Sequence, residues 1–404
     1  MISFEESMER LESIEVTPSG IIELPLMEAI GYYLAEDIIA TYNSPAYPTS
    51  AMDGYAIRFE DQVLKELEVE SINPAGAEEI LELTPGKAIK TFTGSLMPKG
   101  SDTLIPIENV ATEGNRIIIE EEVAYAFSVR EVGESFREGE VLIKEGTKID
   151  FEAVSVLASL NLAKVKVFAK PKVAIIATGS ELLELGQEQT RQSQIRSSNN
   201  YTIEAIVKKY GGEALQLGCI GDNVEALKEQ FKDALERSDI VVSSGGVSVG
   251  DFDFVKDIVR DELGAEVIFK GVVIKPGQHI MVAKAGRKMI IALPGFAYSS
   301  TVTALLYLVP LLYKYNGSHY HMPIVEVTLR SKYKKRSKKT EFTAGNLTLQ
   351  NGKFYLDFIG KKSGTSAIMT NMLGGVALAM SGPDDGDKES GETIKALIYN
   401  LQLN

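Results

Sequence analysis

The stretch from Lys172 to Tyr315 constrains the fold most, because strand-like and helix-like segments alternate along it. Short apolar runs rich in Val and Ile are each followed by a segment whose apolar residues recur at helical spacing. Such alternation predicts a mainly parallel sheet with helices packed on it, as in α/β domains. The expected strands are 173–177, 214–220, 240–243, 267–274 and 289–293, and the expected helices are 199–210, 223–237, 254–263 and the apolar segment after Ser299.

The segments on either side of this stretch have a different character. From Pro45 to about Lys148, short β-rich runs are separated by Gly and Pro turns, which predicts a β-rich domain inserted into the chain. Residues 322–404 are again strand-like and have no helical period, which predicts a small β barrel or sandwich. Further helices are expected at 3–15, 26–40 and 150–160.

The expected fold is therefore a multidomain α/β plus β architecture. It has a central α/β nucleotide-binding-like domain, an inserted β-rich domain and a small C-terminal β barrel. A chain of 404 residues is long enough, since a domain has ~100–200 residues. The expected boundaries are 1–20 with 171–320 for the α/β domain, 21–41 with 147–170 for a helical or extended linking domain, 42–146 for the β-rich domain and 321–404 for the barrel.

The composition excludes several classes of protein and of site. Lys and Arg number 42 against 56 Asp and Glu, so the net charge is −14 and a general nucleic-acid binder is not expected. An anionic substrate would need a local basic pocket or a bridging cation. The single cysteine, Cys219, excludes a disulfide framework and a Cys-rich zinc site, and the 3 histidines leave little room for a His-ligated metal. Any metal should be a hard cation held by oxygen.

No targeting or membrane-spanning segment is expected. The residues from Met1 to Glu6 lack the basic and then apolar order of a signal peptide. The longest apolar stretch, Val302 to Tyr313, is interrupted by Pro310 and is shorter than the ~20 residues that a membrane span needs. We therefore expect a buried helix there and a cytoplasmic protein.

Three loops at the carboxyl ends of expected strands carry the strongest candidates for ligand binding. Ligands of doubly wound sheets bind at this edge, where glycines let backbone N–H groups turn toward an anion. Together the loops predict a phosphate- or oxyanion-binding edge, although any one glycine alone could serve only a tight turn. We call loops 178–181, 244–253 and 293–295 the glycine-rich edge. Its candidate binding residues are Thr178, Gly179, Ser244, Gly245, Gly246, Ser248, Pro294 and Gly295.

Carboxylates and one lysine lie beside this edge in the sequence. Glu181, Asp251 and Asp253 would repel a bound phosphate unless Mg²⁺ lay between them, so they are candidate metal ligands. The alternative that the aspartates cap the following helix stays open. Lys275 follows an apolar strand and supplies a cation, although a lone lysine is typical of a surface. His279 alone is more typical of a structural residue than of a ligand.

Two segments of the expected β-rich domain are unusual for strands. Ser50-Ala51-Met52-Asp53-Gly54-Tyr55-Ala56 combines small residues with one Asp and one Gly, which predicts a close approach of two backbones. The segment from Thr91 to Gly100 has the same character. The residues alone do not decide between a ligand site and a structural turn here.

These segments together resemble the molybdopterin molybdenumtransferase family, which comprises the bacterial MoeA-type proteins and the E domain of gephyrin. They follow the family's order and spacing from about residue 20 to residue 382. The Ser-Ala-Met-Asp-Gly-Tyr-Ala and Ser-Gly-Gly-Val-Ser-Val-Gly motifs are specific, whereas Lys-Pro-Gly alone is weak. The matching stretches are Pro48 to Ala56, Thr93-Gly94, Pro98 with Gly100, Ala177 to Leu182, Ser244 to Asp253, Lys275-Pro276-Gly277 and Leu293-Pro294-Gly295.

The resemblance implies a four-domain, elongated homodimer in which molybdate displaces AMP from adenylylated molybdopterin, with the help of Mg²⁺, to give molybdenum cofactor. It implies that the α/β domain binds the pterin and that the β-rich domain of the other subunit completes the cleft. The upstream adenylyltransferase and molybdoenzyme apoproteins would be further partners. Lys275 would help hold molybdate, and Ser363 matches a family serine near the anion site. The catalytic residues carried over are Asp53, Thr93, Glu181, Asp253 and Lys275.

Three positions depart from the family pattern. Ser135 replaces an acidic residue, and Gln278 and Ala344 replace basic residues, so two cations expected near molybdate are missing. The basic run 332–339 could compensate, unless it is a solvated face. A molybdopterin adenylyltransferase, which shares the α/β module, and a non-catalytic pterin-binding scaffold therefore stay as alternatives. The preference between molybdate and tungstate stays open, because both are tetrahedral dianions of similar size.

Overall fold

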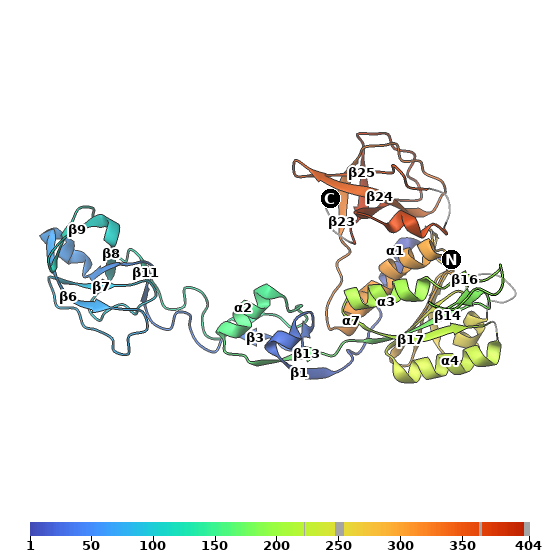
Figure 1. The fold of residues 1–404 in the computed structure, drawn as a ribbon, viewed down its shortest axis with the longest axis horizontal. Helices are drawn as coiled ribbons and strands as arrows, with labels where there is room; N and C mark the ends of the chain where they lie inside the picture. The colour runs from blue at the N-terminus through green and yellow to red at the C-terminus, as the bar shows by residue number, and fades with distance from the viewer. Residues whose placement is uncertain (222, 247–253, 363–365, 400–404) are drawn as a thin grey trace. The chain divides into compact units, whose positions relative to one another are not determined.

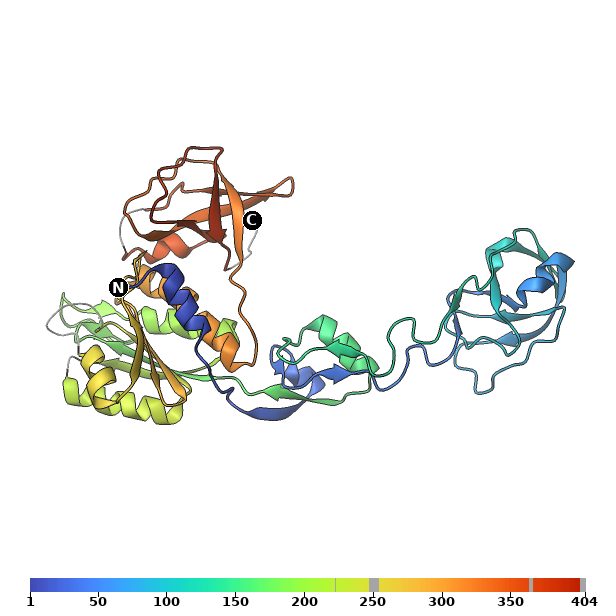
Figure 2. The same cartoon turned by 180° about the vertical axis from the view of Figure 1, so that it is seen from behind.

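The computed structural model describes residues 1–221, 223–246, 254–362 and 366–399. The chain forms two compact units, which Figures 1 and 2 show from opposite sides. The first unit comprises Met1–Glu36, Glu145–Val154 and Ala163–Asn404, and the second comprises Asp37–Lys144 and Ser155–Leu162. The expected helix at 150–160 is present as α2 (Phe151–Ser159). The finer division into four domains stays a prediction.

The centre of the first unit is a six-stranded sheet with the order β17-β14-β18-β22-β21-β19. Its first four strands pair in parallel and its last two are antiparallel, so the expected mainly parallel sheet is confirmed. The strands are β14 (Lys172–Thr178), β17 (Glu213–Ile220), β18 (Ile240–Ser244), β19 (Glu266–Lys270), β21 (Met281–Ala285) and β22 (Lys288–Leu293). Five of these six strands are expected from the sequence, and β21 is not.

Helices cover both faces of this sheet, because successive strand residues point to opposite sides and both sets are apolar. Val173 and Ile175 of β14 pack in one buried cluster, and Ala174 and Ile176 pack in another. The first cluster includes α1 (Phe4–Glu12), α3 (Asn199–Lys209), α6 (Ala297–Thr303), the π-helical turn Ala304–Leu308 and α7 (Val309–Tyr315). The second includes α4 (Val224–Arg237) and α5 (Val255–Asp257), which continues as the π-helical turn Ile258–Glu262.

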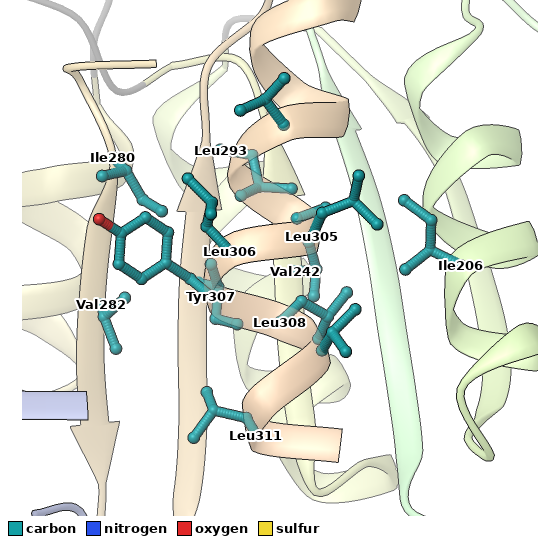
Figure 3. Close-up of a cluster of buried hydrophobic side chains, with 14 of the residues drawn as sticks. Ile206, Val242, Ile280, Val282, Leu293, Leu305, Leu306, Tyr307, Leu308 and Leu311 are labelled. Carbon is teal, nitrogen blue, oxygen red and sulfur yellow. The ribbon is translucent and has the colours of Figure 1, made fainter. Parts of the chain in front are cut away.

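The apolar segment after Ser299 forms the expected buried helix. Leu306, Tyr307 and Leu308 are completely buried. Figure 3 shows these side chains between Val282 of β21 and Ile206 of α3. No helix within the described ranges has both the length and the apolar character needed to span a membrane.

The N-terminal helix begins as its sequence predicts. The Ser3 Oγ accepts a hydrogen bond from the backbone N–H of Glu6 at 3.0 Å and thereby caps α1. The buried Ser7 of this helix contacts the Tyr307 hydroxyl at 2.8 Å. These contacts fix the chain's first residues against the α/β core.

The expected helix at 26–40 is wrong. Only a 3-10 turn, Leu26–Ala29, forms there, followed by the short strands β2 (Tyr33–Leu34) and β3 (Ile38–Ile39). Gly31 has φ +85°, which a helix cannot accommodate. Beyond it β2 pairs with β13 (Lys164–Phe168), which also pairs with β1 (Ile21–Pro25), so long-range strand pairing overrides the local helical pattern.

The C-terminal strands close into a five-stranded barrel. The pairing of β24 with β26 joins the two ends of the strand order β24-β25-β23-β27-β26. A sixth short strand, β20 (Ile274–Lys275), leaves the α/β part and pairs in parallel with β24. The barrel strands are β23 (Ile324–Leu329), β24 (Thr340–Gln350), β25 (Lys353–Asp357), β26 (Val376–Ser381) and β27 (Thr393–Leu397).

The second unit contains the expected β-rich domain. Its main sheet has the order β8-β5-β7-β6-β10-β9. Three of its strands, β7 (Lys87–Thr91), β8 (Thr103–Pro106) and β10 (Arg116–Ile119), coincide with expected β runs. The other strands of the unit are β3, which pairs with β12, and β4 (Thr49–Ser50), β5 (Gly54–Ile57), β6 (Glu66–Asn73), β9 (Val110–Glu113), β11 (Val129–Arg130) and β12 (Val141–Ile143).

Candidate active site

The described parts of the glycine-rich edge meet at the carboxyl ends of β14, β18 and β22. The Thr178 Oγ1 donates to the backbone oxygen of Ser244 at 3.3 Å. The N–H of Gly245 donates to the Leu293 oxygen at 3.0 Å. A Cβ placed on Gly295 would lie 3.7 Å from the Gly245 Cα. Residues far apart in sequence therefore lie side by side at one edge of the sheet.

Gly245 is required by this close packing. Its φ of +95° is unfavourable for residues with a side chain, and a Cβ would lie 2.7 Å from the backbone oxygen of Thr178. Gly179 also has a positive φ, +144°, and Gly246 has +66°. The turns at Gly179, Gly245 and Gly246 thus favour glycine, and the N–H groups of Gly179 and Gly245 fix them to the neighbouring strands through the Ile220 and Leu293 oxygens.

Of the candidate metal ligands, the structure describes Glu181 alone. Its exposed side chain folds back over the preceding turn, since a Cβ on Gly179 would lie 2.6 Å from its Oε2. The candidates Ser248, Asp251, Asp253 and Ser363 lie outside the described residues. Within the described part of the chain, no group of three or more His, Cys, Asp or Glu side chains is placed to hold a metal ion.

Lys275 lies in a cavity between the α/β part and the barrel of the first unit. It ends β20, and its register partner on β24 is Glu341. The Lys275 Nζ lies 3.9 Å from the Glu341 Oε1, and its side chain is 36% exposed. Tyr298 of α6, which follows the Pro294-Gly295 loop, lines the same cavity. The full lining is Lys275, Pro276, Tyr298, Lys332, Tyr333, Lys334, Arg336, Glu341, Phe342, Thr343, Ala344, Phe358, Lys361, Lys362, Ser366 and Asn371.

The lining of this cavity is strongly basic. It includes Lys275 and five basic residues of the barrel, against the single carboxylate of Glu341. This concentration of positive charge contrasts with the net charge of −14 of the whole chain. The cavity is therefore a local basic pocket of the kind that an anionic substrate of this acidic chain would need.

Of the two positions that lack the family's basic residues, one lines this cavity and the other contacts a lysine of the barrel. Ala344 lines it, and its backbone N–H donates to the Tyr298 hydroxyl at 2.9 Å. The Gln278 side-chain oxygen accepts a hydrogen bond from the Lys339 ammonium group. A cation therefore stands beside Gln278, although it comes from the barrel. The Gln278 side-chain nitrogen Nε2 lies 2.7 Å from the Nε2 of His279. His279 therefore has a side-chain partner within the fold, as expected for a structural histidine.

In the second unit, Asp53 and Thr93 form a contact of their own. The Thr93 N–H and hydroxyl donate to the same Asp53 Oδ1 at 2.8 and 2.7 Å. Both hydrogen bonds lower the pKa of Asp53, and the bond from the Thr93 backbone N–H has the larger effect. The expected close approach is present at Gly54, where a Cβ would lie 2.3 Å from the Ile105 oxygen. Ser135 is exposed in the same unit.

Sequence reasoning missed two polar groups near the candidate site. Glu341 is only 3% exposed, and nothing in an apolar strand pattern marks it as the centre of a hydrogen-bond network. The second group is Glu184, which accepts from the Tyr201 hydroxyl at 2.8 Å beside Cys219. Burial, followed by the hydrogen bond to Glu184, raises the pKa of the Cys219 thiol to about 11. Cys219 is thus a protonated thiol at neutral pH and not an activated nucleophile.

Comparison with known proteins decides the family. The family model "MoeA N-terminal region (domain I and II)" matches residues 2–161, and "Probable molybdopterin binding domain" matches residues 174–314. A molybdopterin molybdenumtransferase of Staphylococcus epidermidis is 33% identical over 86% of this chain and 84% of its own. The chain belongs to the molybdopterin molybdenumtransferase family. The relative from a Nostoc species is 34% identical over 88% of this chain and 83% of its own.

Solved structures of the molybdopterin molybdenumtransferase family agree with the fold. The molybdopterin biosynthesis MoeA protein of Pyrococcus horikoshii has a TM-score of 0.84 with this chain at 29% identity, covering 99% of this chain and 100% of that one. A second structure of that name and organism gives a TM-score of 0.81 at 27% identity over the whole of both chains. The expected multidomain α/β plus β fold is confirmed.

Proposed function

We propose that this chain transfers molybdenum to molybdopterin. In this reaction molybdate displaces AMP from adenylylated molybdopterin, and the products are molybdenum cofactor and AMP. The observation that carries the proposal is the basic cavity around Lys275, to which the Pro294-Gly295 loop of the glycine-rich edge connects through α6. One unit thus offers a backbone-lined edge suited to phosphate and a separate basic cavity suited to an oxyanion.

The proposed mechanism depends on positioning and charge. Both reactants are anions, so their mutual repulsion opposes the reaction. The glycine-rich edge, with Thr178, Gly179, Ser244, Gly245, Gly246, Ser248, Pro294 and Gly295, would hold the adenylylated pterin. The N–H groups of Gly179 and Gly245 donate to the Ile220 and Leu293 oxygens, so these two glycines would shape the site rather than donate to the ligand. Lys275, with Ser363 as a neutral donor, would hold molybdate. Preorganised donors of this kind stabilise developing charge without a covalent intermediate. A Cys or His nucleophile is not required, in agreement with the protonated Cys219 thiol.

We further propose that Glu181, Asp251 and Asp253 hold Mg²⁺. Glu181 fits this role because it presents an exposed carboxylate beside the glycine-rich edge, and Mg²⁺ binds through one or two carboxylates together with substrate phosphates. When bound, the ion would neutralise charge between these carboxylates and the phosphate. This is the only role that the proposal assigns to the metal.

The active form in this proposal is a cytoplasmic homodimer in which each cleft takes Asp53 and Thr93 from the other subunit. The support is the family resemblance of both motifs, and the two hydrogen bonds from Thr93 that fix the Asp53 carboxylate. The upstream adenylyltransferase and molybdoenzyme apoproteins would exchange substrate and product with it.

A turnover assay tests the proposed function. Purified protein is given adenylylated molybdopterin, Mg²⁺ and molybdate, and AMP and molybdenum-containing pterin are measured. The proposal expects both products, with AMP release dependent on molybdate. In a parallel assay with ATP and free molybdopterin, an adenylyltransferase would instead release pyrophosphate and form adenylylated molybdopterin. A non-catalytic scaffold would bind the pterin without either reaction, and this result would overturn the proposal.

A further inference from the structure

We propose that Lys334 and Arg336 bind the oxyanion substrate together with Lys275, and that Glu341 is the positioning residue that fixes their loop. The inference rests on the proposed function only for the identity of the anion as molybdate. It assigns a binding role to a basic run that the sequence alone leaves as a candidate solvated face.

Side chains alternate along residues 332–337, which connect β23 to β24. The even-numbered Lys332, Lys334 and Arg336 are exposed and line the cavity. The odd-numbered residues between them are buried or half-buried. The backbone at Tyr333 is extended, since it pairs in antiparallel fashion with Lys388. An extended backbone sends successive side chains to opposite sides, so this loop presents its basic groups to one side.

The odd-numbered residues anchor the loop. The Lys335 ammonium group donates to the backbone oxygens of Lys339 at 2.6 Å and Ser381 at 3.1 Å. The buried Tyr333 bonds through its hydroxyl to the Glu341 Oε2 at 3.1 Å. A freely solvated lysine run would have no such anchors. Lys334 and Arg336 are each flanked by fixed neighbours, which restricts where their charges can lie.

Glu341 joins this loop to Lys275. Its carboxylate accepts hydrogen bonds from the Ser337 hydroxyl at 2.6 Å and from the Arg336 backbone N–H at 3.2 and 3.3 Å. The same carboxylate lies 3.9 Å from the Lys275 ammonium group. Buried carboxylates need such partners, and this one uses donors from both sides of the cavity. A shorter side chain at position 341 would break these contacts and would displace Arg336 and Lys275 together.

The chemistry of the cavity favours a small tetrahedral oxyanion. Of the four aromatic side chains in its lining, Tyr298, Tyr333 and Phe342 are at least nine-tenths buried and Phe358 is half-buried, so the cavity offers little aromatic surface for stacking a flat base. Lys334 and Arg336 line the cavity on the loop that Glu341 fixes, and Lys275 lies beside the same carboxylate, so these are the cations that we assign to the anion. Molybdate and the phosphate of the pterin substrate share this chemistry, and the experiment separates them.

Equilibrium dialysis of the whole protein against molybdate alone, and separately against inorganic phosphate, tests the inference. Lys334→Ala and Arg336→Ala are expected to weaken molybdate binding by about tenfold each, because each removes one charge-assisted contact. The matched control is Lys338→Ala, an exposed lysine of the same run that does not line the cavity. It should change binding by less than about twofold.

Glu341→Asp separates positioning from charge, because it keeps the carboxylate and shortens its reach. We expect about tenfold weaker molybdate binding with an unchanged salt dependence, whereas Lys334→Ala should reduce the salt dependence as well. If Glu341→Asp does not fold, Ser337→Ala serves instead and should weaken binding about threefold. Unchanged affinity in a folded variant would overturn the role of Glu341.

The outcomes distinguish this inference from the proposed function. Wild-type affinity for molybdate in both Lys334→Ala and Arg336→Ala would overturn the inference even if turnover is normal. Weakened phosphate binding with unchanged molybdate binding would assign the cavity to the pterin phosphate and would also overturn it. Selective loss of molybdate binding supports the inference, even if the turnover assay shows that no AMP is released and the proposed reaction is wrong.

Discussion

Thr93 donates two hydrogen bonds to a single carboxylate oxygen of Asp53, from its backbone N–H at 2.8 Å and from its hydroxyl at 2.7 Å. Both bonds favour the ionised form and lower the pKa of Asp53 below its ordinary value of 3.8. The associated stabilisation is therefore fully present above pH 3.8 and is lost as the pH falls through the lower folded pKa.

Thr93→Val should raise the pKa of Asp53 only part of the way to its ordinary value, because the backbone N–H remains the larger cause of the shift. An NMR titration of the Asp53 carboxyl carbon in both proteins measures this change. The control is Thr112→Val, a threonine of β9 in the same unit. A full return of the Asp53 pKa to 3.8 in Thr93→Val would show that the backbone bond does not form in solution.

Mixing two inactive variants should restore activity if the cleft is shared between subunits. Asp53→Asn and Glu181→Gln are each expected to be inactive. In a dimer with one subunit of each kind, one cleft would have both wild-type residues, so free exchange should recover about a quarter of wild-type turnover. The measurement is AMP release before and after the two variants are mixed and re-equilibrated. No recovery in a demonstrated mixed dimer would place both carboxylates in one chain.

The sequence predicted the parts of the fold that depend on local periodicity. The alternating strands and helices of 172–315 and the cap of Ser3 follow from patterns within a few residues. The expected helix at 26–40 failed because β2 and β3 are stabilised by pairing with β13 and β12, far along the chain. No local pattern contains such partners.

The candidate site shows the same limit. The sequence marked Lys275 and the glycine-rich edge, because a motif and its loop are contiguous. It could not place Lys339 against Gln278, since 61 residues separate them and the contact exists only after β20 pairs with β24. The role of Glu341 was missed for the same reason, because its donors lie in a loop that looks solvated by composition.

Tyr307→Phe should destabilise the first unit by about 1 kcal/mol, because it removes a buried hydroxyl that contacts Ser7 Oγ at 2.8 Å. The ring and its packing remain. Urea unfolding followed by circular dichroism measures the change. Tyr355→Phe is the matched control, since the half-buried Tyr355 keeps its ring below Arg330 and should lose less than about 0.5 kcal/mol. Equal stability of both variants would show that the Ser7–Tyr307 contact contributes nothing.

Asp253→Asn should abolish turnover and leave the fold intact, and excess chelator should do the same to the wild type. The reason is that carboxylates beside a phosphate-binding edge require a cation. Asp257→Asn, an exposed neighbour that pairs with Arg260 at 3.6 Å, is the control and should remain active. Full turnover in chelator would refute the metal role. An unfolded Asp253→Asn protein would identify Asp253 as a structural residue instead.

A titration of molybdate against AMP release, in the wild type and in Lys275→Ala, tests the central claim most directly. The cavity around Lys275 is where the proposed reaction takes its oxyanion, so the variant should need at least about tenfold more molybdate for half-maximal turnover, which corresponds to ~1.4 kcal/mol. Its affinity for the adenylylated pterin should change less, because the glycine-rich edge is intact. An unchanged half-saturating molybdate concentration would contradict the account and place the anion elsewhere.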